Sequence, residues 1–363
     1  MHFRPPRSPR LLTLTPDFPP SVGGIQLLLE RLLQHLPEWE HRVVARRAAG
    51  PESPVPSWRT RRVAGPSSIA ELNVLGARAG RRWAPDVVLN GHVHTTPGAL
   101  AVAARRDTPI VTYAYADELT HRPALTRLAA RRSSAMIAIS RYTADLIHEH
   151  HPRGPVDLVL PGFDQRAVLP APASRPTLLT VARLADRYKG HDVVLQALPA
   201  VLERFPDAQW VIAGDGPLRG ELEARAASLG VSDSVRFLGY VDDAQRAELL
   251  SRAWVFVMPS RLPPRGAGGE GFGIVYLEAA EAGVPVVAGN VAGALDAVDD
   301  GRSGLLVDPE RPEAVAGALL RLLSDPRERR TMAAHGPEWA ARFTWPRMAA
   351  QVDHVLRREL GRG

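Results

Sequence analysis

The chain contains a single lysine, Lys189, among its 45 lysine and arginine residues. It lies six residues after Arg183 in the stretch VARLADRYKGHD, between an expected strand and an expected helix. A guanidinium offers a planar fork of donors and an ammonium a compact charge, and together they suit a diphosphate. Two ordinary surface cations are the alternative. A chain that otherwise uses arginine would more often place arginine at a tolerant surface position, which favours a specific role for Lys189.

A second group of chemically capable residues lies in the stretch GGEGFGIVYLEAAEAG, where Glu270 precedes Glu278 by eight residues. Glu270 stands in a glycine-rich loop before an expected helix, whose first free N–H groups can bind an anion. We expect Glu270 to accept hydrogen bonds from hydroxyl groups at the mouth of this helix, and Glu278 to reach a ribose. The alternative is that these carboxylates are solvated side chains on a helix. This explanation suits Glu281 better than Glu270, which is surrounded by glycines.

Glycines and histidines suggest further sites in the first half. Gly23 and Gly24 stand between the first expected strand and helix, where a glycine turn can aim backbone N–H groups at an anion. The spacing matches neither the dinucleotide fingerprint nor a Walker A loop, and a plain βα turn is the alternative. His92 and His94 follow a later strand. They have no evident third metal ligand, so a ligand-binding role and ordinary loop histidines both stay open.

The elements that must position these residues alternate between short apolar runs and helical periodicity, which predicts parallel sheets built from βαβ units. Two doubly wound α/β domains are expected, with ligands bound at the carboxyl ends of the strands. We expect strands at 10–15, 41–46, 85–90, 109–115, 135–140, 177–183, 208–216, 235–241, 254–260 and 284–289, and helices at 25–36, 97–106, 191–205, 220–230 and 274–283.

The length of 363 residues also predicts two domains. We expect one domain at 1–165, a second domain at 166–343, and a C-terminal helix at 344–363. The linker is expected within 161–176, which is rich in Pro, Ala and Ser.

Composition narrows the function classes. The chain has no cysteine, which excludes disulfides and thiolate metal sites. It shows neither a signal peptide nor a run of ~18 apolar residues, so we expect a cytoplasmic protein that contacts at most the inner face of a membrane.

Residues 1–165 hold 21 arginines against 14 carboxylates. This excess suits an anionic membrane or substrate, and an arginine-rich solvated surface is the alternative. The arginine pairs lack stacking aromatics, so nucleic acid is not expected as a partner.

The ordered motifs resemble the retaining nucleotide-sugar glycosyltransferases of the GT-B fold, the group 1 and family 4 type, and are most similar to the phosphatidylinositol mannosyltransferase branch. The resemblance covers nearly the whole chain. It implies that 1–165 is an acceptor-side domain, that 166–343 is a nucleotide-sugar-binding domain, and that the C-terminal helix at 344–363 returns to the first domain. Its motifs are Gly23–Gly24, SRYT (140–143), PGFD (161–164), VARL (181–184) continuing to Lys189–Gly190, AGDGP (213–217), FLGYV (237–241), Pro259–Ser260, the pair Glu270 and Glu278, GVPVV (283–287) and GRSGLLV (301–307).

The resemblance implies roles for individual residues. Arg183 and Lys189 would neutralise the donor diphosphate, Glu270 would contact the transferred sugar, and Asp117 is a further catalytic candidate. The implied donor-binding residues are Gly23, Gly24, Gly239, Tyr240, Val241, Phe272, Gly273, Ile274 and Glu278. No metal and no cofactor beyond the sugar nucleotide are implied.

One segment departs from the family pattern. Many relatives carry a histidine near the reacting sugar in a sequence like H-G-x-E, whereas this chain reads YAYADE at 113–118. Tyr115 or Asp117 would occupy the space of that histidine, and Glu118 matches the acidic position. The acceptor-side candidates are therefore His92, His94, Tyr115 and Glu118.

The function that the resemblance implies is retaining transfer of a hexosyl unit from GDP-mannose or a UDP-sugar to a hydroxyl. The acceptor would be lipid-linked, a cyclitol or a secondary metabolite. The expected partners are the sugar nucleotide, a small-molecule or lipid acceptor and an anionic membrane surface. The alternative is a non-catalytic protein that binds sugar nucleotides on the same fold, which the altered Tyr115–Asp117 segment would suit.

Overall fold

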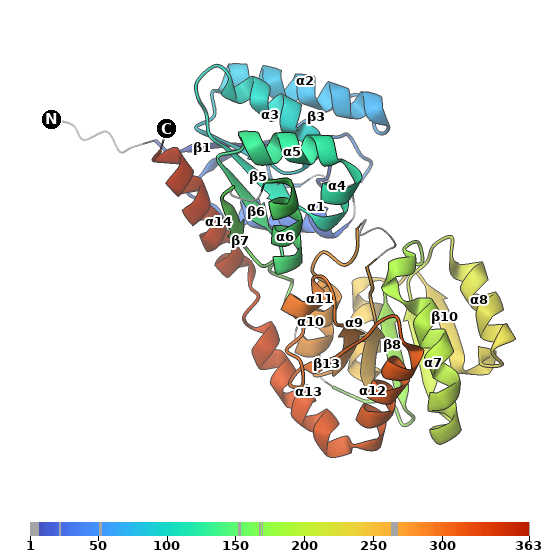
Figure 1. Ribbon diagram of the computed structural model, residues 1–363. Helices are drawn as coiled ribbons and strands as arrows, with labels where there is room; N and C mark the ends of the chain where they lie inside the picture. The colour runs from blue at the N-terminus through green and yellow to red at the C-terminus, as the bar shows by residue number, and fades with distance from the viewer. Residues whose placement is uncertain are drawn as a thin grey trace. The chain divides into compact units, whose positions relative to one another are not determined.

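A computed structural model describes residues 7–21, 23–50, 53–151, 154–166, 168, 170–262 and 268–362 (Figure 1). The chain divides into two compact units. The first unit comprises Met1–Gly162 together with Thr344–Gly363, and the second comprises Phe163–Phe343.

The first unit is built on a seven-stranded parallel sheet in the order β3-β2-β1-β4-β5-β6-β7. The central strands are short apolar runs with every residue buried or nearly so, as parallel strands covered by helices require. The strands are β1 (Arg10–Thr15), β2 (Glu40–Ala45), β3 (Ser57–Arg59), β4 (Val87–Asn90), β5 (Ile110–Ala114), β6 (Ala135–Ala138) and β7 (Val156–Leu158).

Helices connect these parallel strands. Because β4 pairs with β1 and β5 pairs with β4, the loops that follow these three strands meet at one edge of the sheet. The helices are α1 (Gly24–Gln34), α2 (Pro66–Trp83), η1 (Val93–Thr95), α3 (Thr96–Ala103), α4 (Ala116–His121), α5 (Pro123–Arg132) and α6 (Arg141–His150).

The C-terminal helix α14 (Trp345–Leu360) belongs to the first unit, which confirms the predicted return of the chain end. Its apolar residues recur every three or four positions, and this stripe packs beside α1 and against β4, β5 and β6. Arg358 holds Asp157 of β7 through two hydrogen bonds of 2.8 and 2.7 Å, and the indole nitrogen of Trp39 donates to Asp353 over 2.7 Å.

The second unit contains a six-stranded parallel sheet in the order β10-β9-β8-β11-β12-β13. Its strands are β8 (Thr177–Val181), β9 (Gln209–Ala213), β10 (Val235–Gly239), β11 (Val255–Met258), β12 (Val286–Gly289) and β13 (Gly304–Val307). Its helices are η2 (Arg187–Lys189), α7 (His191–Arg204), α8 (Arg219–Ser228), η3 (Ser232–Ser234), α9 (Asp243–Arg252), α10 (Ile274–Glu281), α11 (Ala294–Ala297), α12 (Pro312–Ser324) and α13 (Pro326–Ala340).

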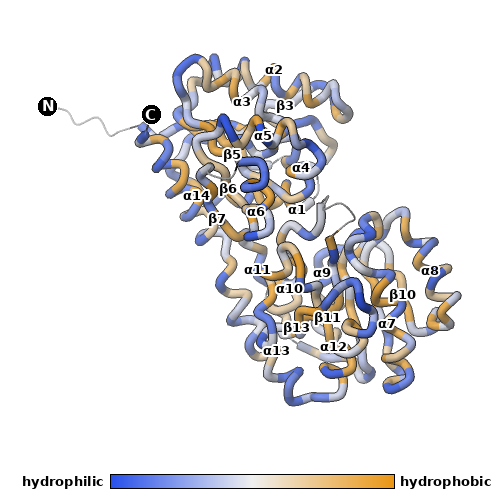
Figure 2. Tube along the Cα trace, viewed as in Figure 1, coloured by the Kyte–Doolittle hydropathy of each residue, from blue (hydrophilic) through white to orange (hydrophobic). Residues whose placement is uncertain are grey.

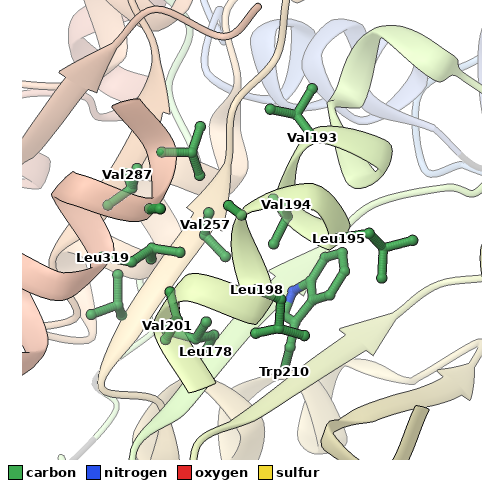
Figure 3. Packing of buried hydrophobic residues seen from close by; sticks show 14 of the residues in the cluster. Leu178, Val193, Val194, Leu195, Leu198, Val201, Trp210, Val257, Val287 and Leu319 are labelled. Carbon is green, nitrogen blue, oxygen red and sulfur yellow. The ribbon is translucent and has the colours of Figure 1, made fainter. Parts of the chain in front are cut away.

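The core of the second unit joins α7 and α12 to the strands. Figure 3 shows Leu198 and Val201 of α7 near Trp210 of β9 and Leu178 of β8, and all four side chains are completely buried. The hydropathy colouring places apolar residues along strands and helices and polar residues at many turns (Figure 2). The structure thus confirms the predicted α/β class with two parallel sheets.

Three strands were not predicted: β3, β7 and β13. Each has only three or four residues and lies at the end of its sheet. The sequences of β3 (SWR) and β7 (VDL) carry no continuous apolar run, and the apolar run of β13 (GLLV) is too short to identify a strand by itself. Among the described residues, none of the helices combines the length and apolarity needed to cross a bilayer.

Candidate active site

The structure brings Lys189 and Glu270 together. The Nζ atom of Lys189 lies 2.5 Å from Oε2 of Glu270, although the residues are 81 positions apart. Only 14% of the lysine side chain and 12% of the glutamate side chain are exposed. A charged contact this short and this sheltered creates a fixed pair of opposite charges at the carboxyl end of the second sheet.

Backbone geometry explains why the lysine reaches this position. Lys189 ends the short helix η2, and the next residue, Gly190, has a φ of 76°. A Cβ atom at Gly190 would lie 2.3 Å from the carbonyl oxygen of Pro259, so only glycine lets the two loops approach this closely. The loop after β8 is thereby held against the loop after β11.

The surroundings keep Lys189 protonated. Burial acts to lower the pKa of Lys189, but the charge and hydrogen bond of Glu270 outweigh it, and the pKa is raised above its ordinary value. The ring of Tyr188 adds a cation–π contact at 5.1 Å. Lys189 therefore carries a full positive charge at neutral pH.

Glu270 is fixed from the main chain as well. Its carbonyl oxygen accepts a hydrogen bond of 2.9 Å from the amide of Gly293, which begins the short helix α11. Three residues after Glu270, Gly273 has a φ of 92° and begins α10. The predicted arrangement of a carboxylate beside a helix N-terminus is therefore present, and Phe272 is buried while Ile274 is the first helical residue. Roles in donor binding stay predictions.

Arg183 lies two residues beyond β8, and its side chain is 78% exposed. It donates to Asp186 over 3.1 Å, a contact that water weakens at this exposure. The guanidinium can therefore move to an anionic ligand at low cost. The predicted pair of cations thus consists of one sheltered, fixed lysine and one exposed arginine.

Glu278 forms a separate cluster with Arg246 of α9, whose NH2 atom lies 3.4 Å from Oε1 of Glu278. Burial raises the pKa of Glu278, and Arg246 and Arg166 oppose this increase. Arg166 also pairs with Asp243 at 2.5 Å. The sequence did not predict these arginine partners, since α9 was not among the expected helices.

The predicted base-binding segment lies at the end of β10. Gly239 has a φ of 73°, and its carbonyl oxygen accepts a hydrogen bond of 2.7 Å from the amide of Gly214 after β9. Tyr240 is 80% exposed, and Val241 is half-buried. A flat, exposed aromatic ring on a fixed turn offers a stacking surface for a base.

In the first unit, His92, Glu118 and Asp17 form a buried polar cluster, which we call the His92 cluster. The Nδ1 atom of His92 lies 2.7 Å from Oε2 of Glu118, and its Nε2 atom lies 3.9 Å from Oδ2 of Asp17. Burial acts to lower the pKa of His92, but the two carboxylates outweigh it and raise the pKa. His94 stacks on His92 with ring centroids 4.5 Å apart, and its pKa is lowered by burial and by the charge of His92.

The other acceptor-side candidates lie in different surroundings. Tyr115 is buried, whereas the Asp117 side chain is 82% exposed and lies 3.2 Å from Nδ1 of His121. Asp117 therefore does not join the His92 cluster.

Gly23 and Gly24 begin α1 and are exposed. Asp17 was missed by the sequence analysis, although a carboxylate two residues after the first strand is a usable signal.

No group of three or more His, Cys, Asp or Glu side chains in the described residue ranges is arranged to hold a metal ion. The polar groups that could hold a charged ligand are instead the cations Arg183 and Lys189 and the amides that begin α10.

Two family models together match most of the chain. The model described as Glycosyltransferase Family 4 matches residues 22–166, and the model described as Glycosyl transferases group 1 matches residues 163–339. The first lies almost entirely in the first unit, and the second lies within the second unit.

One curated relative matches over nearly its full length, and another matches over about half of its length. The GDP-mannose-dependent alpha-(1-6)-phosphatidylinositol monomannoside mannosyltransferase of Mycolicibacterium smegmatis is 31% identical over 393 residues, covering 95% of this chain and 98% of that protein. The D-inositol 3-phosphate glycosyltransferase of Corynebacterium urealyticum is 37% identical over 218 residues, covering 57% of this chain and 50% of that protein.

Solved structures share the fold. The sucrose-phosphate synthase from Thermosynechococcus elongatus superposes with a TM-score of 0.83 at 21% identity, covering 98% of this chain and all of that chain. HepE from Anabaena in complex with UDP and glucose gives a TM-score of 0.77 at 19% identity, covering 96% of this chain and 99% of that chain. The likeness confirms the predicted GT-B fold.

Proposed function

Because the chain belongs to the glycosyltransferases of group 1 and family 4, we propose that it transfers mannose from GDP-mannose to a hydroxyl of a phosphatidylinositol mannoside. The chain is a glycosyltransferase enzyme. The choice of donor and acceptor rests on the relative from M. smegmatis, whose name states both and which matches along 98% of its length. A UDP-sugar donor and a soluble cyclitol acceptor are the competing choices.

The observation that carries the proposal is the sheltered pair of Lys189 and Glu270 beside the N-terminus of α10. Breaking the bond between the sugar and the diphosphate leaves negative charge on the β-phosphate. Once Lys189 contacts the bound diphosphate, its ammonium stabilises that charge as it develops. Arg183, exposed on the same loop, supplies the second cation.

Glu270 has a complementary task in this proposal. When Lys189 turns toward a phosphate, the Glu270 carboxylate becomes available to accept hydrogen bonds from sugar hydroxyls. Its carbonyl remains held by Gly293, so the carboxylate stays at the mouth of α10. Because Glu270 is paired with a cation and used for hydroxyl binding, we assign it no nucleophilic role. We propose that the acceptor attacks from the face that the diphosphate leaves, which retains the anomeric configuration.

Two cations beside the expected diphosphate position also make a divalent metal unnecessary for charge neutralisation. We therefore propose that transfer continues in the presence of EDTA. A strict requirement for Mg²⁺ or Mn²⁺ would contradict this part of the proposal.

A lipid acceptor requires contact with a membrane surface. The α2 helix of the first unit presents Val74, Arg78, Arg81 and Arg82 as exposed residues, and Val63 before the helix is 62% exposed. Arginines beside exposed apolar side chains favour binding to anionic headgroups. We propose that this surface makes peripheral contact with the membrane.

Two measurements test the proposed function. The first is the shift in melting temperature with GDP, UDP, ADP and dTDP, because a ligand that binds only the folded state raises this temperature. The second is transfer of labelled mannose from GDP-mannose to phosphatidylinositol monomannoside, with the product anomer assigned by NMR. An enzyme selective for UDP contradicts the donor, and a β-linked product contradicts retention. Binding of GDP without transfer to any lipid or cyclitol favours the non-catalytic alternative.

A further inference from the structure

The His92 cluster lies where three neighbouring strands end. Asp17 follows β1, His92 follows β4 and Glu118 lies in α4 after β5, and these strands are adjacent in the sheet. All three side chains are at most 18% exposed. Burying ionisable groups opposes folding unless they are paired, so such clusters occur preferentially where they serve binding or chemistry.

Glu118 fixes the orientation of His92. Its Oε2 atom accepts from the amide of Val93 over 2.9 Å, and its Oε1 atom accepts from the amide of Tyr115 over 3.1 Å. The carboxylate is therefore held from two loops while it contacts Nδ1 of His92 at 2.7 Å. A contact of this length requires a proton between the two atoms, so Nδ1 is the donor. The amide of His94 lies 3.1 Å from the same nitrogen and donates to it when that nitrogen carries no proton.

The opposite side of the imidazole faces Asp17. Its Nε2 atom lies 3.9 Å from Oδ2 of Asp17, too far for a direct hydrogen bond. The other carboxylate oxygen, Oδ1, accepts from Gln26 over 3.0 Å and lies 3.6 Å from NH2 of Arg46. Asp17 is thus held through Oδ1, while Oδ2 faces a nitrogen that donates when His92 is protonated.

This spacing suits one hydroxyl group. An oxygen atom can lie at about 2.8 Å from both Nε2 and Oδ2, because the two atoms are closer than twice that length. A hydroxyl has one hydrogen to donate and lone pairs that accept. It can therefore donate to the Asp17 carboxylate and accept from the His92 imidazolium in the same position.

We propose that Asp17 and His92 jointly bind one hydroxyl of a polyhydroxylated acceptor ring, a sugar or a cyclitol. Glu118 is a positioning residue that acts through His92. The inference deepens the proposed glycosyl transfer and rests on it, since it identifies the groups of the first unit that recognise the acceptor. No proton leaves the acceptor in this binding step.

Tyr115 supplies an independent observation at the same place. Its side chain is buried, and its hydroxyl has no hydrogen-bond partner among the described residues. Burial, the neighbouring hydroxyl of Tyr113 and the charges of Glu118 and Asp17 raise the pKa of this hydroxyl well above its ordinary value, so the hydroxyl stays neutral. The amide of Tyr115 donates to Glu118 of the His92 cluster over 3.1 Å, and a neutral donor without a partner on this residue suits a second hydroxyl of the same ring.

The charge on His92 makes acceptor binding sensitive to pH. The charged or titratable groups that face it are Glu118, Asp17, Arg46 and His94. Burial and Arg46 lower the pKa of His92, whereas the two carboxylates raise it, and the result lies above 6.5. The imidazolium therefore persists above pH 6.5, and acceptor binding weakens as the pH rises through the raised pKa.

The first experiment measures binding without the donor. Ligand-observed NMR with myo-inositol and with methyl α-D-mannoside compares the wild-type protein with Asp17→Asn and His92→Gln. We expect the wild-type protein to bind at least one polyol at millimolar concentration, and both variants to bind it about 10- to 100-fold more weakly. The control is His35→Gln, because His35 is an exposed histidine at the end of α1. Melting temperatures show that each variant is folded, and Glu118→Gln replaces any variant that is not.

The second experiment separates acceptor recognition from donor chemistry. For wild-type protein that turns over GDP-mannose, Asp17→Asn and His92→Gln should raise KM for the acceptor far more than they change the affinity for GDP. The decline at high pH should disappear in His92→Gln. Polyol binding equal to wild type in both variants overturns the inference, as does absence of polyol binding by the wild-type protein. Failure to use GDP-mannose overturns only the proposed donor, because the NMR result stands without it.

Discussion

The Nζ atom of Lys189 and the Oε2 atom of Glu270 lie 2.5 Å apart, and this contact joins the loop after β8 to the loop before α10. The two residues stabilise each other in the ligand-free protein. In the proposed reaction each has a different partner, the diphosphate for the lysine and the sugar for the glutamate.

Replacing Lys189 with alanine should reduce kcat/KM for the donor about 30- to 900-fold. This range corresponds to about 2–4 kcal/mol, the usual effect of removing one group that stabilises developing negative charge. Steady-state kinetics with GDP-mannose measures it. Lys189→Arg should recover only part of the activity, because a planar guanidinium replaces a compact ammonium in a sheltered position. Near-normal turnover by Lys189→Ala would eliminate the proposed role.

The same pair predicts an effect on stability. Lys189→Met should lower the free energy of unfolding by about 1–3 kcal/mol, because it leaves a largely buried carboxylate without its cation. The double variant with Glu270→Gln should recover much of this loss. Urea unfolding measures both. The control is Glu221→Gln, which breaks the exposed pair with Arg187 at 2.6 Å and should change nothing measurable. Additive losses in the double variant would contradict the coupling.

The backbone conformation at the start of α10 predicts that a side chain at position 273 destabilises the protein. Gly273 has a φ of 92°, and a Cβ atom there would lie 2.4 Å from the ring of Tyr276. That ring is completely buried, and its hydroxyl donates to Met258 over 2.9 Å, so it has little freedom to move. Gly273→Ala should therefore cost at least about 1–2 kcal/mol of stability and weaken GDP binding.

The matched control for Gly273→Ala is Gly220→Ala, in the first turn of α8. An added Cβ at Gly220 meets no atom within 4 Å. Alanine in a helix restricts the unfolded chain more than glycine does, so this variant should be as stable as wild type or more stable by about 0.4–1 kcal/mol. Thermal unfolding of the two variants tests the contrast. Equal melting temperatures would show that the turn at Gly273 tolerates a side chain.

Some of this site could be predicted from the sequence and some could not. The order of the family motifs along the chain assigned Lys189 and Glu270 to one donor site, whereas their direct ion pair was not predicted. His92 and Glu118 were both predicted as acceptor-side candidates, but their grouping with Asp17 was not predicted, since the three residues belong to no single motif. They meet only because β1, β4 and β5 are adjacent in the sheet, and local sequence does not encode strand order.

The same distinction applies to the fold. Fully buried strands such as β4 and β11 were predicted, because continuous apolar runs identify them. The helix α2 was missed, since its mean apolar character is low and its apolar residues are interrupted by glycines and arginines. The pairing of Glu278 with Arg246 depends on how α9 packs beside α10, which no local pattern reports.

Acid should destabilise the second unit through His191. Burial and the nearby charge of Lys189 lower the pKa of His191 to about 4, from an ordinary value of 6.5. Between these values the unfolded chain binds a proton that the folded protein does not, so stability decreases as the pH falls. The full effect, reached below the folded pKa, is about 3 kcal/mol.

The variant His191→Phe isolates this contribution of His191. Urea unfolding at pH 7 and pH 4.5 should show a smaller acid-induced loss in the variant than in the wild-type protein. Carboxylates titrate in both proteins, so the difference between the two losses reports on His191. Equal losses would mean that His191 is protonated in the folded state without cost.

The exposed face of α2 predicts binding to anionic membranes. Arg78, Arg81 and Arg82 lie near the C-terminal end of this helix, and Val74 is 50% exposed one turn earlier. Each arginine near an anionic surface contributes about 1 kcal/mol, so replacing all three with glutamine should weaken binding about 150-fold. Sedimentation with phosphatidylinositol-containing vesicles measures the loss, and the wild-type protein should bind these vesicles more tightly than neutral ones.

The matched control replaces three exposed arginines of the second unit with glutamine, which changes the net charge equally. These residues are Arg204, Arg225 and Arg330. An equal loss in both triple variants would assign the binding to overall charge and contradict a specific role for α2.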